Sequence, residues 1–151
     1  MQVKDILAVK GSAVFAIRPD DSIEALCQLL RARRIGATIV SSDGQKIEGV
    51  ISERDVAYGL AVHGAELGRM LVSALMTRTV ITCAPDDQLA TVASTMRSRN
   101  IRHLPVEDEG RAIGMVSIRD VLNFRVDDLQ QETALLASFV RETERPIQDR
   151  E

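Results

Sequence analysis

The chain has almost no aromatic side chains: of its 151 residues, 3% are aromatic and none is tryptophan. Its hydrophobic core must therefore be built from aliphatic side chains and methionine. Proteins that bind single-stranded nucleic acid commonly stack the bases on aromatic rings, and general polyanion binders carry a basic surface. Because the formal net charge is −3, both observations argue against nucleic acid as a partner.

Cysteine is also scarce, and long hydrophobic runs are absent. Two cysteines cannot form a disulfide framework, and Cys27 lies within an apolar helical pattern. Both facts favour a reducing, cytoplasmic location. The first residues lack the basic and apolar regions of a signal peptide. No run approaches the roughly 18 apolar residues of a membrane-spanning helix, so we expect no membrane association.

The sequence contains no recognisable metal-binding or catalytic motif. Neither His63 nor His103 stands at a metal-ligand spacing from a cysteine, so we expect no metal site. There is no phosphate-binding Gly-x-x-x-x-Gly-Lys loop, no Gly-x-Gly-x-x-Gly fingerprint and no nucleophile elbow. We therefore expect no catalytic residues and no catalytic cofactor.

The strongest positive signal is an octapeptide that occurs twice. Residues 49–56 read Gly-Val-Ile-Ser-Glu-Arg-Asp-Val, and residues 114–121 read Gly-Met-Val-Ser-Ile-Arg-Asp-Val. This pattern predicts a buried strand that turns directly into a helix, with the serine at the N-cap. The start of a helix presents unpaired N–H groups that can hold an anion. Capping alone explains Ser-x-x-Asp, but it does not require the arginine that stands beside the aspartate in both copies.

The internal repeat extends well beyond this octapeptide. Pro19 matches Pro85 at an offset of 66 residues, and Ser52 matches Ser117 at an offset of 65, because the second hairpin loop is one residue shorter. A repeat of this length predicts duplication of a β-α-β-β-α unit. Neither unit can bury its apolar side chains alone, so we expect an α/β fold. Its two sheets pack about a pseudo-two-fold axis, and the strand-to-helix turns face clefts between the units.

This pattern divides the chain into five segments. They are a first repeat with its lead-in (1–60), a connector (61–71), a second repeat (72–124), a C-terminal amphipathic helix (125–145) and a polar tail (146–151). The expected strands are 13–17, 35–40 and 47–51 in the first repeat, and 79–83, 101–106 and 112–116 in the second. The apolar stripe of the C-terminal helix covers either the chain's own core or a partner subunit, with a homodimer favoured. Its members are Val126, Leu129, Leu135, Leu136, Phe139 and Val140.

Taken together, these motifs resemble the CBS domain pair, also called a Bateman module. The signature of that family is glycine, two apolar residues, serine or threonine, two free positions and aspartate, which residues 49–55 and 114–120 match. The Pro-Asp-Asp turns and the 101–106 strand are also similar, and the resemblance extends over about residues 2–124. It implies a non-catalytic sensor of adenine nucleotides (AMP, ADP, ATP, NAD or S-adenosylmethionine). Such a module acts by ligand-dependent conformational change; here the resemblance leaves open whether it acts on an unidentified effector protein or as a buffer or sensor with an unknown output.

The resemblance also assigns roles to individual residues. Asp55 and Asp120 are expected to accept the two hydroxyls of a ribose. Ser52 and Ser117, with the N–H groups at the start of their helices, are expected to hold a phosphate. The other expected ligand-binding residues are Arg54 and Arg119 as added positive charge, Ala16 and Ile17 near the first cleft, and Thr82, Cys83, Ile101, Arg102 and His103 near the second.

Four of these assignments have a competing interpretation, and the two repeats are not equivalent. The side chains of Arg54 and Arg119 also fit positions that point to solvent. Cys83 also fits a small core residue, and His103 also fits a strand histidine that satisfies a backbone carbonyl. The first repeat has Gly36 and Ala37 where the second has Arg102 and His103, so the second cleft is expected to bind more strongly.

A catalytic alternative is excluded on length, and a non-catalytic one stays open. Inosine monophosphate dehydrogenase carries such a pair, but its catalytic barrel of about 250 residues does not fit this chain. The alternative function is a protein-interaction scaffold with vestigial clefts. The identity of the nucleotide, the number of occupied clefts and the downstream partner stay open at this stage.

Overall fold

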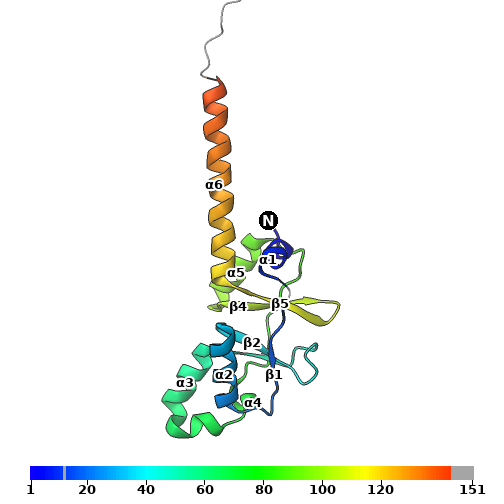
Figure 1. Cartoon of the computed structure of the whole chain (residues 1–151), viewed down its shortest axis with the longest axis vertical. Coiled ribbons are helices and arrows are strands. Elements are labelled where there is room, and N and C mark those ends of the chain that lie inside the picture. Colours follow the sequence, from blue (N-terminus) through cyan, green and yellow to red (C-terminus); the bar gives the residue numbers. More distant parts are fainter. Residues whose placement is uncertain (12, 144–151) are drawn as a thin grey trace, which may run out of the picture.

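The computed structural model describes residues 1–11 and 13–143. The two repeats form two α/β units, one above the other in the view of Figure 1, from which one long helix projects. This confirms the predicted fold class. The predicted tail, 146–151, and the predicted end of the C-terminal helix, before Pro146, lie outside the described residues.

The first repeat contains the three strands that its sequence predicts. They form one sheet of order β1-β2-β3, in which β1 is parallel and β3 antiparallel to the central strand β2. The elements of this unit are β1 (Ala16–Ile17), α2 (Ile23–Arg33), β2 (Ala37–Val40), β3 (Gly49–Ser52), α3 (Glu53–His63) and the 3-10 helix η1 (Gly64–Arg69).

The second repeat forms only two of its three predicted strands. Its elements are α5 (Leu89–Arg99), β4 (His103–Asp108), β5 (Arg111–Ser117) and the beginning of α6 (Ile118–Thr143). Strands β4 and β5 form an antiparallel hairpin. Its turn residues, Glu109 and Gly110, both have positive φ, as a two-residue hairpin turn with the right-handed twist requires.

The predicted strand at 79–83 is wrong: only Cys83 pairs with the sheet, in a parallel bridge to Val106. The next hydrogen bond of such a parallel pairing needs an N–H donor at Pro105, and proline has none. In the first repeat, Ile39 stands at the position of Pro105 and pairs normally with Ala16 of β1. A single proline therefore explains why one sheet has three strands and the other two.

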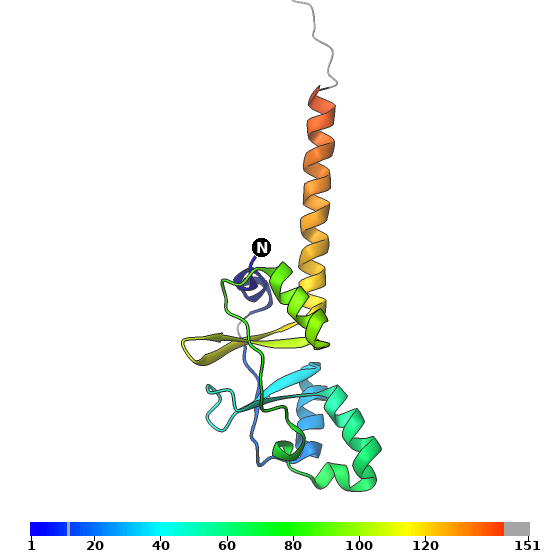
Figure 2. The same ribbon diagram turned by 180° about the vertical axis from the view of Figure 1, so that it is seen from behind.

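The short helix that precedes each repeat packs against the other repeat. Helix α1 (Val3–Lys10) precedes the first repeat, but its Val3 and Ile6 belong to the hydrophobic core of the second. Helix α4 (Val72–Leu75) precedes the second repeat and places Val72 in the core of the first. Figures 1 and 2 show α1 beside the upper unit and α4 at the lower one. The chain thus crosses between the units twice. The core of the second repeat includes residues of α1, and the core of the first repeat includes Val72 of α4.

The glycine that opens each octapeptide lies where a lead-in segment, the short helix before a repeat with the residues that follow it, crosses the sheet. A Cβ on Gly49 would lie 2.8 Å from Sδ of Met76 and 2.9 Å from the carbonyl oxygen of Thr77. A Cβ on Gly114 would lie 2.7 Å from Cδ2 of Leu7. All three distances are shorter than a Cβ contact allows unless the neighbour shifts, so close approach of a neighbouring segment explains the glycine in both copies.

Helix α6 unites two elements that the sequence analysis treats separately, the last helix of the second repeat and the C-terminal amphipathic helix. Val121 is fully buried and Phe124 packs against the core of the second repeat. Beyond these residues the helix stands clear of the body (Figures 1 and 2). Within the described ranges, no helix is both long and apolar enough to cross a membrane.

Candidate functional site

Two clefts lie between the repeats, and each combines the octapeptide of one repeat with an extended segment of the other. The larger, about 740 Å³, is lined by Ser117, Arg119 and Asp120 together with residues 13–15 and 34–39 of the first repeat. The exchange of lead-in segments brings these parts of the chain together, because the chain enters each sheet from the opposite unit.

The smaller cleft has the same construction with the repeats interchanged. Its volume is about 400 Å³, and it is lined by Ser52, Arg54 and Asp55 together with residues 79–81 and 100–103. Under the offset of 66 residues, the segment 79–81 corresponds to 13–15 of the larger cleft. The two clefts are therefore equivalent sites related by the duplication.

In the smaller cleft, Asp55 closes the start of α3. Its Oδ2 accepts a hydrogen bond from the backbone N–H of Ser52 at 2.8 Å, while the Ser52 hydroxyl caps the helix. In the part of the chain that the structure describes, Asp55 forms no ion pair. Its carboxylate is thus held in a fixed orientation with one oxygen engaged, and it retains acceptor capacity for a ligand.

In the larger cleft, Asp120 holds the same position at the start of α6 but is joined by a cation. Its Oδ2 accepts the backbone N–H of Ser117 at 2.9 Å and the Nζ of Lys10 at 2.8 Å. Burial raises the pKa of Asp120, but the hydrogen bonds from Lys10 and Ser117 outweigh burial and hold the pKa below its ordinary value of 3.8. The carboxylate is therefore ionised at neutral pH and able to accept hydroxyl groups.

Lys10 is a site residue that the sequence analysis missed. It is the last residue of α1, and its Nζ also donates to the carbonyl oxygen of Met115 at 3.0 Å. No spacing along the chain connects Lys10 with Asp120, because the contact exists only through the exchange of α1 to the second repeat.

His103 and Arg102 lie between the clefts and line both, as does Glu53 at the start of α3. A Cβ on Gly36 would approach the His103 ring to 3.2 Å, so the ring packs directly against the backbone of the first repeat. Burial lowers the pKa of His103 below 6.5, helped by the positive charges of Lys10 and Arg102 and opposed by Glu53 and Asp120. The ring is therefore mostly neutral at pH 7.

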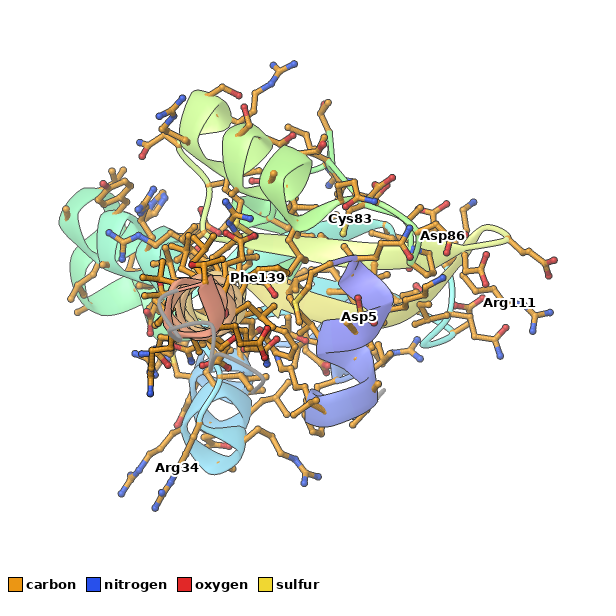
Figure 3. All side chains as sticks on the ribbon, turned by 90° about the horizontal axis from the view of Figure 1, so that it is seen from above. Asp5, Arg34, Cys83, Asp86, Arg111 and Phe139 are labelled. Carbon is orange, nitrogen blue, oxygen red and sulfur yellow. The ribbon has the colours of Figure 1, made fainter. Side chains whose placement is uncertain are left out.

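The two clefts differ in charge as well as in size. The described lining of the smaller has two cationic and two acidic side chains, and Arg54 there already donates to the carbonyl oxygen of Asn100 at 3.1 Å. The larger cleft has five cationic side chains and two acidic ones. Its cations are Lys10, Arg31, Arg34, Arg102 and Arg119, and its acids are Glu53 and Asp120. One of these cations, Arg34 at the end of α2, points away from the body (Figure 3).

Four of the predicted ligand-binding residues line neither cleft. Ile17 and Cys83 are 7% and 6% exposed and belong to the two cores. Burial raises the pKa of the Cys83 thiol to about 12, as expected for a core cysteine. Ala16 and Thr82 immediately precede these residues and are also absent from the linings. The residues that do line the clefts come a few positions earlier, at 13–15 and 79–81.

The other predicted residues each line a cleft, as described above. The predicted grouping is wrong for Ile101, which the sequence analysis places near the second cleft: it lies in the smaller cleft beside Asp55, because each octapeptide faces the extended segment of the other repeat. Their role in binding stays a prediction. Besides Lys10, the lining residues that the sequence analysis did not single out include Phe15, Glu53, Thr77, Thr79, Ile81 and Asn100. Within residues 1–11 and 13–143 there is no cluster of metal-ligating side chains.

Comparison with known proteins gives a consistent result. The family model described as "CBS domain" matches residues 3–61 and 72–127. The chain is 35% identical to a CBS-domain-containing protein of Agrobacterium tumefaciens of known structure, with a TM-score of 0.80 and coverage of 83% of this chain and 99% of that one. It is 27% identical over 147 residues to the mitochondrial CBS domain-containing protein CBSX3 of Arabidopsis thaliana, covering 92% of this chain and 71% of that protein.

A third similar protein has been crystallised with ligands. The CBS domain pair of protein MJ0100, in complex with 5′-methylthioadenosine and S-adenosyl-L-methionine, is 28% identical, with a TM-score of 0.74 and coverage of 82% of this chain and 98% of that one. Other curated relatives are much longer. This chain spans 26% of two of them and 23–25% of those that are enzymes.

Proposed function

This chain belongs to the CBS domain family, and on that premise we propose that it is a non-catalytic regulatory module that binds an adenosine-containing ligand between its repeats. One observation carries the proposal: an oriented carboxylate and the start of a helix face the same cleft, and the arrangement occurs twice. The similar MJ0100 pair, crystallised with two adenosine derivatives, supports the same class of ligand. The enzymes that this chain matches are about four times longer than the matched region, so the match covers only about a quarter of each enzyme.

The geometry of the larger cleft suits a nucleotide. Asp120 is ionised and directed into the cleft, so its oxygens suit the two hydroxyls of a ribose. The N–H groups at the start of α6, together with Arg119 and Arg102, suit a phosphate. The apolar segment 13–15 supplies a wall for the adenine ring.

The difference in charge between the clefts suggests a division of ligands. The excess of cationic side chains in the larger cleft favours AMP, ADP, ATP or NAD, because each carries negative phosphate groups. The smaller cleft, with balanced charges and about half the volume, favours adenosine or S-adenosylmethionine, which lack phosphate. We therefore keep the second octapeptide, with Asp120, as the site of stronger nucleotide binding.

A ligand in either cleft contacts both repeats and so favours one relative orientation of the two units. We propose that an effector protein reads this orientation, and that the protein acts in the cytoplasm as a homodimer. A free thiol at the exposed Cys27 supports a reducing location.

The alternative function, a protein-interaction scaffold with vestigial clefts, has one observation in its favour. Lys10 occupies an oxygen of Asp120 that a ribose would need. A scaffold would retain such an ion pair permanently, whereas a sensor exchanges it for ligand.

A thermal-shift panel with AMP, ADP, ATP, NAD and S-adenosylmethionine tests the proposal. A ligand at about 100 times its Kd stabilises the folded state by about 2.7 kcal/mol, which corresponds to roughly 5–10 °C for a domain of this size. Asp120→Asn should remove most of the shift with nucleotides, and Asp55→Asn should remove less. Asp20→Asn, at an exposed ion pair with Arg18 outside both clefts, is the control. If no ligand of the panel shifts the melting temperature, the scaffold is the better description.

A further inference from the structure

Helix α6 carries a seam of side chains with a seven-residue period. Leu122, Leu129 and Leu136 are seven residues apart, and each is followed four residues later by a β-branched residue. Alternating steps of four and three are the spacing of the a and d positions in a coiled coil. Leucine then occupies every d position, and the a positions hold Val126, Thr133 and Val140.

Among residues 1–11 and 13–143, no side chain covers this seam. Its leucines and valines are between 51% and 68% exposed. The residues that attach α6 to the body, Val121 and Phe124, stand at the c and f positions, on the opposite face of the helix. Phe139, labelled on the end-on view of α6 in Figure 3, flanks the seam at a g position and is 66% exposed.

We propose that the seam pairs with the same seam of a second copy of this chain, as a parallel two-stranded coiled coil. Three observations identify a second copy as the occupant. First, β-branched residues at a with leucine at d favour two parallel strands. Second, the body lies on the face away from the seam, so two bodies can sit outside the paired helices without obstructing them.

Third, the flanking charges and the apolar area fit self-pairing. In parallel register Arg125 faces Gln130 of the second copy and Glu132 faces Ala137, so no like charges meet. The five leucines and valines of the seam and the flanking Phe139, each losing roughly 100 Å², remove roughly 1,200 Å² from water in the pair of helices, the lower end of the range for specific interfaces. The polar Thr133 at the central a position favours a single register, because a pairing shifted by one heptad would place its hydroxyl against valine.

The proposal specifies the interface of the proposed homodimer and does not depend on ligand binding. It has a consequence for the ligand site nonetheless. Asp120 lies in the first turn of the helix that carries the seam, so the parallel pair places the two larger clefts at the same end of the dimer.

Two adjacent leucines provide the test. Leu136 is in the seam and Leu135 is one position outside it, with similar exposed fractions of 68% and 63%. By sedimentation velocity of the full chain without ligand, the wild type and Leu135→Glu should be dimers and Leu136→Glu a monomer. Circular dichroism of Leu136→Glu should still show a folded α/β protein. A monomeric wild type, or a Leu136→Glu variant that stays dimeric, overturns the proposal.

Oxidative cross-linking tests the parallel orientation. In a Cys27→Ser background, Val126→Cys places a thiol at an a position, beside its twin only if the helices are parallel. Mild oxidation should give a covalent dimer on a non-reducing gel, and Asp127→Cys, on the outer face, should not. Cross-linking that fails at 126 in a dimeric protein refutes the parallel coiled coil.

Discussion

Replacing Lys10 by methionine should change the ligand preference of the larger cleft. Nζ of Lys10 lies 2.8 Å from Oδ2 of Asp120, one of the two carboxylate oxygens that would accept the hydroxyls of a ribose. A ligand without phosphate must break this ion pair and gains nothing from the released ammonium group. A ligand with phosphates breaks the same pair but can re-form an ion pair with Lys10. The variant should therefore bind adenosine more tightly and ATP more weakly.

The magnitude follows from the exposure of the pair. The two side chains are 42% and 22% exposed, so solvent screens much of their attraction. Pairs of this kind contribute about 1 kcal/mol at most, which is roughly fivefold in Kd. We expect the Kd of adenosine to fall by about two- to fivefold and that of ATP to rise by a similar factor, so that their ratio changes roughly tenfold.

Isothermal titration calorimetry at fixed ionic strength measures both constants. Lys4→Met is the matched control, because Lys4 stands on the same helix and pairs with Asp86 at 2.9 Å, outside both clefts. It should leave both constants unchanged. If Lys10→Met shifts adenosine and ATP in the same direction, or leaves the Kd of adenosine unaltered, then Lys10 does not compete for Asp120 and the reasoning fails.

Two further predictions concern pH and the octapeptide glycines. Because burial lowers the pKa of His103 below 6.5 in the folded state, the unfolded chain binds that proton more readily, so stability should fall as pH drops below about 6.5. Chemical denaturation between pH 7.5 and 5.5 should show this loss, and His103→Gln should reduce it; an unchanged slope in the variant would exclude His103 as the cause. Gly49→Ala should cost about 1–3 kcal/mol by overpacking, and Gly114→Ala less, because the added methyl meets backbone at Gly49 but the end of a leucine side chain at Gly114. Equal melting temperatures for the two variants would contradict this ranking.

The duplication was readable from the sequence, because repeated residues report on repeated local structure. The offset between Ser52 and Ser117 predicted both strand-to-helix turns, and both form with their serines bonded to the aspartates three residues later. Local pattern also predicted a strand at 79–83, which fails for a reason outside that segment. Its partner strand carries Pro105, which lacks the N–H group that the pairing needs.

The composition of the clefts was less predictable, because it depends on how the two units exchange segments. Hydrophobic periodicity predicts that α1 and α4 each pack against a hydrophobic core, but it does not distinguish the core of the first repeat from that of the second. Once α1 lies on the second repeat, Lys10 reaches Asp120, and the segment 13–15 rather than Ala16 and Ile17 faces the cleft. Such contacts between distant segments leave no periodic trace in the sequence.

The two octapeptides open helices that end differently, and this difference separates the roles of the two clefts. Helix α3 begins beside Asp55 and stops at His63, where Gly64 adopts a positive φ of 60°. At the corresponding position under the 65-residue offset the second repeat has Leu129, and α6 continues to Thr143. A displacement of Asp55 therefore acts on a helix that ends within the body. A displacement of Asp120 acts on the first turn of a 26-residue helix, whose far part is exposed and carries the pairing seam. Since a helix of this kind moves as a rigid element, the larger cleft has the direct mechanical route to the surface on which two copies would meet.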